Sequence, residues 1–344
     1  MLNKEGVRRP LLASTREICD TLEECYRDAA AHPSPYGEHF RRVVANGSLK
    51  MEIVDILRLV RMSGIRHQGK DVLEAGCGYG LPALVFCLLG ARHVEGIDVN
   101  DAALRAFNLL LALRNDLFER VRAGRGDVAA LDYPNLSFDM VYSIEAVSHY
   151  RKVRAFLKET ARVLRPGGVL VISDCNNGAN PIIRKRNHDL WDLIENGPEG
   201  AQFRGETIGK PYVELRRELI QRFKPDLAPD VPGILARRTS GMGANAVIDA
   251  VRAYVSTGQL PNSVYRKGTC PLNPMLNAVR GRLFHPVELC KEIEAHGFDV
   301  RVRSHFGGRR SRIVAFLDWL QAPLPARATL RAAWGYKIFA TKKH

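Results

Sequence analysis

The 344-residue sequence lacks the marks of several protein classes. No apolar run approaches the roughly 18 residues of a transmembrane helix, and the first ten residues contain no apolar core, so neither a membrane span nor a secretory signal is expected. The seven cysteines are odd in number and form no Cys-x-x-Cys pair. We therefore expect reduced cysteines in a cytoplasmic protein, with no metal site and no disulfide framework.

Aromatic residues are also scarce, at 8%, which disfavours the stacking platforms that bind single-stranded nucleic acid. Positive charge is abundant but uneven. The net charge is +14, and residues 176–283 alone carry 16 basic and 10 acidic side chains. A basic surface attracts anionic partners, such as RNA or acidic small molecules, although it also simply keeps a protein soluble.

Short apolar segments alternate with helical segments over much of the chain. This alternation predicts an α/β fold, with a parallel sheet covered by helices on both faces. The expected strands are 71–75, 93–98, 121–125, 138–143 and 169–173, followed after an interruption by 298–304 and 334–341.

The pattern divides the chain into three regions. Residues 1–65 form a helical N-terminal cap, with helices at 14–31, 38–45 and 49–63. Residues 66–175 and 284–344 form the α/β core. Residues 176–283 form a large inserted helical lid or substrate domain in which no strand is expected and Lys224–Gly233 is read as a loop.

A glycine-rich turn, Gly76-Cys-Gly-Tyr-Gly80, follows the first strand directly. Its glycines permit positive φ angles and let the backbone approach a ligand closely. Glu74 precedes the turn, and Asp98 ends the next strand, where a carboxylate can accept hydrogen bonds from the hydroxyl groups of a ribose. The third glycine comes one residue too early for a dinucleotide site, and Glu74 would repel a pyrophosphate. The turn therefore favours a ligand that carries an amino group.

These segments resemble the motifs of class I S-adenosylmethionine-dependent methyltransferases. Val72–Gly80 is similar to the first motif and Glu95–Asp98 to the second; the three later motifs are Gly126–Val128, Phe138–His149 and Leu164–Ser173. The resemblance implies a Rossmann-like, seven-stranded methyltransferase sheet, with the helical insertion placed after strand five. It also implies S-adenosylmethionine as cofactor and S-adenosylhomocysteine as product.

The resemblance further assigns cofactor contacts by position. Glu74 would orient the cofactor ammonium, the glycines would line its methionine end, Asp98 would accept the ribose hydroxyls, and Asp127 would bond the adenine amino group. The full set implied to bind the cofactor is Glu74, Gly76, Gly78, Gly80, Asp98, Val99, Asn100, Asp127 and Val128.

Three residues are candidates for catalysis: Glu145, His149 and Asp174. Glu145 opens the segment after strand four, which in this family lies near the transferred methyl group. His149, four residues later, is the candidate general base. Asp174 follows strand five, at the sheet edge where ligands bind, and Asn176 and Asn177 beside it are candidates for either acceptor binding or a turn.

We expect methyl transfer to an oxygen or nitrogen atom of a small molecule, because an insertion of this size could enclose a pocket. The alternatives are an RNA methyltransferase that uses basic clusters such as Arg184–Arg186 and Arg309–Arg312, and an inactive cofactor-binding scaffold. An anionic acceptor and a homodimer remain open, whereas nucleic acid and membranes are not expected as partners.

Overall fold

The computed structural model describes residues 14–204, 206–307 and 326–344. The basic cluster Arg309–Arg312 lies outside the described residues. The chain splits into two compact units. The core unit takes in the residues up to Val147, Lys152–Cys175 and the residues from Pro286 on; the insertion unit consists of Ser148–Arg151 and Asn176–His285. None of the helices in the described ranges combines the length and apolarity of a membrane span.

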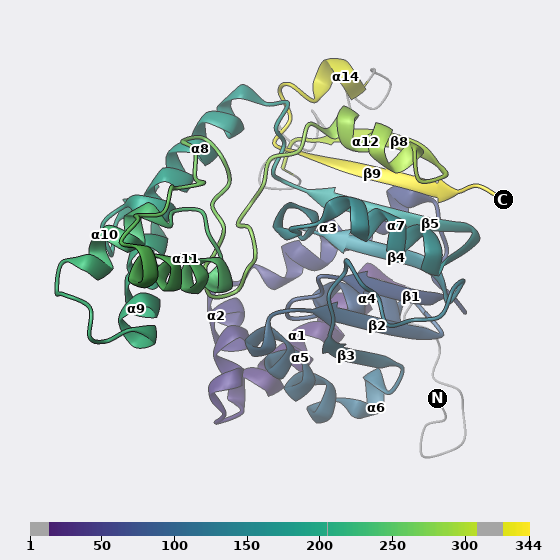
Figure 1. Ribbon diagram of the computed structural model, residues 1–344. Coiled ribbons are helices and arrows are strands. Elements are labelled where there is room, and N and C mark those ends of the chain that lie inside the picture. Colours follow the sequence, from purple (N-terminus) through teal and green to yellow (C-terminus); the bar gives the residue numbers. More distant parts are fainter. Residues whose placement is uncertain (1–13, 205, 308–325) are drawn as a thin grey trace. The chain divides into compact units, whose positions relative to one another are not determined.

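A seven-stranded sheet forms the centre of the core unit (Figure 1), in the order β3-β2-β1-β4-β5-β9-β8. Its strands are β1 (Asp71–Ala75), β2 (His93–Asp98), β3 (Val121–Arg125), β4 (Phe138–Ile144), β5 (Leu164–Asp174), β8 (Phe298–His305) and β9 (Gly335–Lys342). The pairs from β3 to β5 are parallel, whereas β9 is antiparallel to both β5 and β8. This mixed α/β sheet confirms the expected Rossmann-like, seven-stranded fold.

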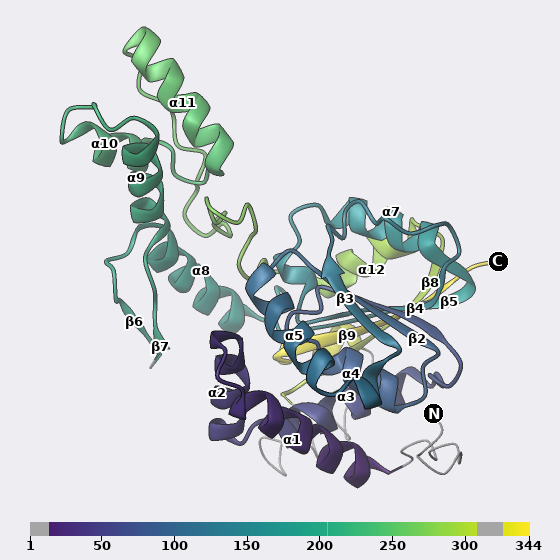
Figure 2. The same ribbon diagram turned by 90° about the horizontal axis from the view of Figure 1, so that it is seen from below.

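Helices cover both faces of the sheet (Figure 2). One face carries α7 (Val153–Val163) and α12 (Pro286–Glu294). The other carries α4 (Leu81–Leu88), α5 (Asp101–Leu113) and the short α6 (Asn115–Phe118). Arg114 leaves the helical conformation and separates α5 from α6. A short helix, α14 (Ala326–Thr329), precedes β9.

The N-terminal helices pack on the α4 and α5 side. They are α1 (Thr15–Ala31), the 3-10 turn η1 (Pro35–Gly37), α2 (Glu38–Asn46) and α3 (Leu49–Ser63). Ser14 caps α1: its hydroxyl accepts the Glu17 N–H at 3.2 Å, and the Glu17 carboxylate accepts the Ser14 N–H at 3.1 Å. Buried residues of α1 to α3 share one hydrophobic core with α4 and α5, so this cap is part of the core unit.

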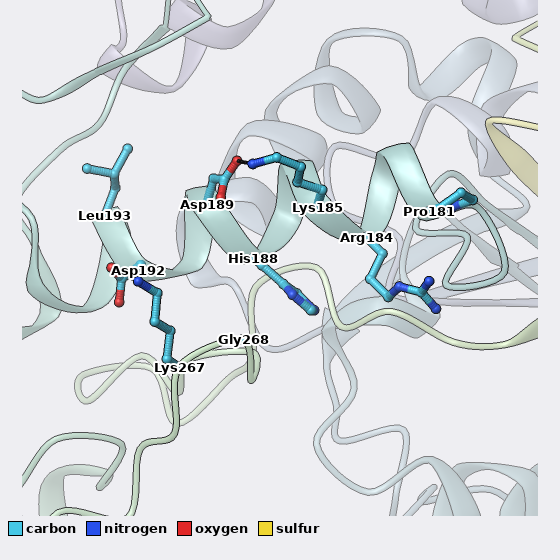
Figure 3. Close-up of a pocket in the computed structure, with 9 residues that line it drawn as sticks. All are labelled: Pro181, Arg184, Lys185, His188, Asp189, Asp192, Leu193, Lys267 and Gly268. Atoms are coloured by element: carbon cyan, nitrogen blue, oxygen red, sulfur yellow. Dashed lines mark hydrogen bonds and ion pairs between the residues drawn. The ribbon is translucent and has the colours of Figure 1, made fainter.

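The insertion unit is mainly helical. Its helices are α8 (Pro181–Asn196), α9 (Tyr212–Phe223), α10 (Val231–Arg238) and α11 (Ala244–Thr257), and η2 (Val147–His149) leads into its first segment. Ile220, Leu235 and Val247 lie at the centre of its own core. Along one side of α8 lies a pocket of about 620 Å³ (Figure 3).

Two sequence expectations for this insertion were wrong. The loop predicted up to Gly233 ends earlier, because α10 begins at Val231 with Pro232 in its first turn, where a missing N–H costs no hydrogen bond. A two-stranded hairpin, β6 (Gln202–Phe203) with β7 (Glu206–Thr207), also occurs where no strand was expected. Strands of two residues are too short to leave a periodic pattern.

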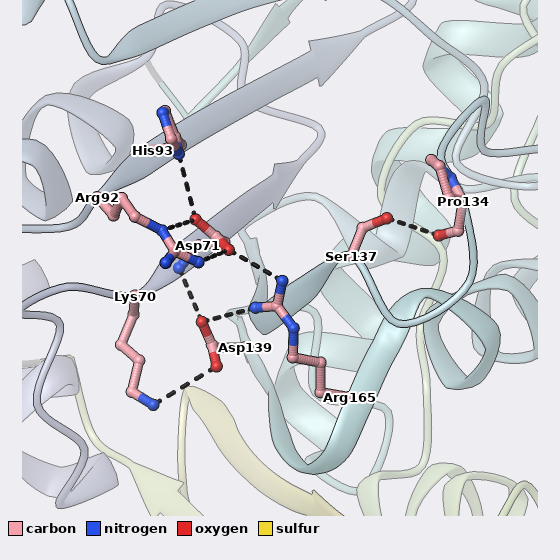
Figure 4. A network of polar contacts seen from close by, with 8 residues as sticks. All are labelled: Lys70, Asp71, Arg92, His93, Pro134, Ser137, Asp139 and Arg165. Atoms are coloured by element: carbon pink, nitrogen blue, oxygen red, sulfur yellow. Dashed lines mark hydrogen bonds and ion pairs between the residues drawn. The ribbon is translucent and has the colours of Figure 1, made fainter.

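In the core unit, ion pairs join the amino ends of the strands (Figure 4). Asp71, at the start of β1, is paired with Arg92 and lies 3.0 Å from Arg165. Arg165 also lies 2.9 Å from Asp139 of β4, which in turn faces Lys70 at 3.4 Å. Arg165 belongs to β5, which already pairs with β4 at Leu164, before the start expected at residue 169. The register then shifts, which accommodates the Pro-Gly-Gly segment as a bulge.

Candidate functional site

The glycine-rich turn after β1 lies where the strand order reverses, between β1 and β4, the position at which open α/β sheets bind ligands. Gly76, Gly78 and Gly80 all have positive φ angles, of 72°, 51° and 80°. At Gly80 an added Cβ would lie 2.2 Å from the Phe107 ring, so this glycine is required for packing. At Gly78 an added Cβ would meet nothing within 4 Å. Gly78 therefore leaves open space that a ligand can enter.

Asp98 fixes this turn from the end of β2. Its Oδ2 accepts the Gly78 N–H at 2.8 Å, and its Oδ1 accepts the Asn100 N–H at 2.8 Å. An ionised carboxylate has about four acceptor positions, so each oxygen retains one for a further donor. The geometry suits two neighbouring hydroxyl groups, as on a ribose.

Glu74 lies below the turn with only 1% of its surface exposed. The Oε2 atom has no hydrogen-bond partner among the described residues. Burial, together with the Asp98 carboxylate, raises the pKa of Glu74 well above its ordinary value, although the nearby backbone N–H of Ala83, in the first turn of α4, lowers it in part. An unpartnered buried carboxyl group is costly, and a ligand ammonium would supply the missing partner. Glu74, Gly78 and Asp98 thus fit the amino and ribose groups of S-adenosylmethionine.

The other implied cofactor residues follow β2 and β3. Asn100 caps α5, because its Oδ1 accepts the N–H groups of Ala102 and Ala103 at 3.1 and 3.3 Å. Val99 is half exposed. Asp127 is exposed, and its Oδ1 accepts the Ala129 N–H at 2.8 Å, which makes a tight turn and occupies one oxygen. Val128 is buried. Asn100 and Asp127 therefore have structural roles, and an adenine contact by Asp127 stays a prediction.

Glu145 connects the carboxyl ends of β4 and β5. Its φ of 50° is left-handed, which is strained for a residue other than glycine. Its N–H donates to Ser173 O at 2.7 Å. Its carboxylate accepts the Cys175 N–H at 3.1 Å and lies 3.3 Å from the Cys175 thiol. These contacts hold the carboxylate at the edge where β1 also ends.

Glu145 is an exposed residue, yet atoms of Cys175 lie close to its carboxylate. Desolvation of the carboxyl group, followed by the neighbouring Asp174 carboxylate, raises the pKa of Glu145 to about 7. Asp174 is 1% exposed. Glu145 therefore changes its charge near neutral pH. Perturbed titration at a strand edge is a frequent property of functional sites.

His149 belongs to the insertion unit. Its Nδ1 lies 3.2 Å from Val279 O, and because a carbonyl only accepts, Nδ1 carries the proton. Nε2 of the neutral ring is then left as an acceptor, the state that a general base requires. In the same unit, the Asn177 side chain accepts the Ala179 N–H at 3.0 Å, and Asn176 donates to the Ser148 hydroxyl at 3.0 Å. Asn177 thus makes a turn.

One contact at the turn was missed from the sequence. His39 of α2 stacks on Tyr79, between Gly78 and Gly80, with ring centroids 3.4 Å apart and an interplanar angle of 3°. Burial, with Arg42 nearby, lowers the pKa of His39 to about 4, so the ring is neutral. No sequence pattern links residues 40 positions apart, and the contact depends on how α2 packs.

A family model described as a methyltransferase domain matches residues 73–172. A sterol 24-C-methyltransferase of Neurospora crassa is 37% identical over 194 residues, which cover 54% of this chain and 50% of that protein. A 27-O-demethylrifamycin SV methyltransferase of Amycolatopsis mediterranei is 34% identical over 117 residues, covering 34% and 42%.

The chain thus spans half or less of the length of these two relatives. For a sterol 24-C-methyltransferase of Gibberella zeae, the match spans 33% of that protein. An S-adenosylmethionine dependent methyltransferase structure from Mesorhizobium loti has a TM-score of 0.43 at 16% identity, covering 82% of this chain and 95% of the other. The sheet order, the glycine-rich turn and the family match agree with the sequence motifs. The chain therefore carries a methyltransferase domain of the class I S-adenosylmethionine-dependent family.

Proposed function

We propose that the protein transfers a methyl group from S-adenosylmethionine to a small-molecule acceptor. The observation that carries the proposal is the buried, unpartnered Oε2 of Glu74 beneath the open backbone of Gly78. The ammonium group of S-adenosylmethionine would be a partner for the Glu74 oxygen, and the cofactor would have room beside Gly78. Asp98 has free acceptor positions for the ribose of the cofactor. When bound, the cofactor supplies an electrophilic methyl group.

Proton transfer and binding of the acceptor are the tasks of side chains at the strand ends and in the insertion. His149 Nε2 accepts the proton of an acceptor hydroxyl as the new bond forms. Glu145, in its ionised form, binds and orients a polar group of the acceptor. Much of the rate comes from positioning, because the reaction is an in-line displacement. Desolvation and then the neighbouring Asp174 carboxylate raise the pKa of Glu145, so that its ionisation falls near neutral pH.

Two of the relatives named above are called sterol 24-C-methyltransferases, and the third is called a 27-O-demethylrifamycin SV methyltransferase. These names support a small-molecule acceptor and add carbon to the oxygen and nitrogen atoms expected from the sequence. An acceptor oxygen is the case in which His149 has a defined task. An anionic acceptor, a homodimer and a cytoplasmic location stay predictions.

Calorimetry with S-adenosylhomocysteine tests the cofactor half of the proposal. Glu74→Gln retains the size of the side chain but removes the charge, and we expect affinity to fall by at least about tenfold. Glu95→Gln, which changes a half-buried carboxyl on the neighbouring strand β2, is the matched control and should bind normally. Wild-type protein that binds neither S-adenosylmethionine nor S-adenosylhomocysteine would contradict the proposal.

Production of S-adenosylhomocysteine, measured with a sterol, a phenol and a primary amine as acceptors, tests the catalytic half. We expect one acceptor class to raise product formation above the level seen without acceptor. Product formation stimulated by RNA alone would contradict a small-molecule acceptor.

A further inference from the structure

The pocket in the insertion unit has no role in the chemistry proposed above. It lies between one side of α8 and the loop at residues 267–268, and its volume of about 620 Å³ is within the range of small-molecule sites. Its lining residues are Pro181, Arg184, Lys185, His188, Asp189, Asp192, Leu193, Lys267 and Gly268.

The charges of this pocket do not cancel. Lys185 pairs with Asp189 at 3.0 Å. Lys267 lies 4.0 Å from Asp192. Each carboxylate thus has its own lysine, and Arg184 is left as the uncompensated charge. Within the part of the chain that the structure describes, neither the Arg184 side chain nor the His188 side chain has a hydrogen bond or an ion pair.

Arg184 and His188 lie on the same side of α8. They are four residues apart, one turn of α8, and both side chains extend from α8 toward the side on which the 267–268 loop lies (Figure 3). Gly268 has a φ of 82°, and a Cβ there would lie 3.3 Å from His188 Nδ1. The glycine therefore lets the loop backbone pass close to the imidazole.

The position of Arg184 has no benefit for the helix itself. Arg184, Lys185 and Arg186 follow one another near the amino end of α8, where the helix dipole disfavours positive charge. The first turn of α8 contains no acidic residue to balance them. A bound anion would offset this unfavourable charge.

We propose that this pocket binds a single anionic group, carboxylate or phosphate, of a small organic molecule. The Arg184 guanidinium presents a planar fork of N–H donors that matches two oxygens of either group. His188 adds a donor beside it, and the charge of the ligand balances that of Arg184. The site lies wholly within the insertion unit and does not rest on the proposed methyl transfer.

The test uses the full chain with isotope-labelled histidine, titrated with inorganic phosphate and with glycerol phosphate at constant ionic strength. We expect a saturable shift of the His188 resonance, which His188→Gln assigns. Arg184→Gln should weaken binding by at least about tenfold, because it removes charge-assisted hydrogen bonds. Arg186→Gln, which removes the same charge from the same helix but not from the pocket lining, should bind as wild type.

A shift that never saturates, or equal weakening by Arg184→Gln and Arg186→Gln, overturns the proposal, because it would reflect the general positive field of the helix. An oligoribonucleotide provides the second arm. If the oligoribonucleotide binds, and Arg184→Gln and Arg186→Gln weaken its binding equally, this face is a nucleic-acid contact and the small-molecule site is rejected. Thermal unfolding of each variant checks that the substitutions leave the fold intact.

Discussion

The Gly78 backbone N–H donates to the Asp98 carboxylate across 2.8 Å, joining residues 20 positions apart. This bond fixes the glycine-rich turn against the end of β2 and orients the carboxylate toward the open space above Gly78. The same side chain therefore shapes the turn and retains acceptor positions for a ligand.

Replacement of Asp98 should weaken cofactor binding strongly. Asp98→Ala removes both the support of Gly78 and the acceptors for the ribose, and we expect a loss of about 1.5–3 kcal/mol in the binding of S-adenosylhomocysteine. Calorimetry measures the loss. Asp116→Ala, at an exposed acid of α6, is the control. Unchanged affinity of Asp98→Ala would remove the ribose assignment.

The stack of His39 on Tyr79 should support cofactor affinity. His39→Ala leaves Tyr79 without its partner, so the turn loses order, and we expect affinity for S-adenosylhomocysteine to fall about fivefold, from the loss of roughly 1 kcal/mol of ring contact. His39→Phe keeps an aromatic ring and should restore the affinity. If both variants bind like wild type, the stack serves the packing of α2 alone.

Glu145 should make acceptor binding depend on pH. Its pKa of about 7 means that the ionised form is lost as the pH falls through neutrality, and KM for the acceptor should rise there. Glu145→Gln should raise KM by about tenfold at pH 8 and abolish this pH dependence. Steady-state kinetics measured at roughly half-unit pH intervals from about pH 6 to about pH 9 give both effects.

The matched control for Glu145 is Glu288→Gln, an exposed acid of α12 in the same unit. It should leave the kinetics unchanged. A Glu145→Gln enzyme with the wild-type pH profile would show that Glu145 only ties β4 to β5.

His149 should act on turnover rather than on binding. If the acceptor is an alcohol or phenol, His149→Gln removes the proton acceptor and should lower kcat by about 10²–10⁴-fold, with cofactor affinity retained. Single-turnover kinetics and calorimetry separate the two quantities. Near-normal turnover would reject the base role. It would favour methylation of an amine, which needs no base when it is neutral.

The ion-pair network at the amino ends of the strands should stabilise the core unit in a pH-dependent way. Hydrogen bonds from Arg92 and then Arg165 and His93 hold the pKa of Asp71 well below its usual range. The stabilisation is therefore present above the unfolded pKa of about 3.9 and is lost as the pH falls through the lower folded value.

Asp71→Asn should accordingly cost about 1–3 kcal/mol at pH 7, because Asp71 is mostly buried while its arginine partners are partly exposed. The difference in the free energy of unfolding between Asp71→Asn and wild type should shrink as the pH falls toward about 2. Urea unfolding at several pH values measures it. Asp20→Asn, in an exposed pair of α1, should cost close to nothing.

Local chemistry made several features predictable from the sequence. The turn needs positive φ at Gly76, Gly78 and Gly80, which glycine alone adopts easily, so the motif is visible in the chain. The apolar segments that precede and follow it alternate with helical patterns, which identified the α/β sheet. The interruption after strand five was equally visible, because strand periodicity stops there.

Tertiary structure alone decided the rest, because contacts between distant residues leave no periodic signal. The sequence could not show that Cys175 holds the Glu145 carboxylate, or that His39 covers Tyr79. Nor could it show that one Asp127 carboxylate oxygen accepts a backbone N–H of its own turn. It also could not show that Lys185 and Lys267 each lie near an aspartate in the pocket, which leaves the Arg184 side chain without an acidic partner. Such properties depend on which side chains the fold brings within a few ångströms of one another, and that follows from packing rather than from sequence spacing.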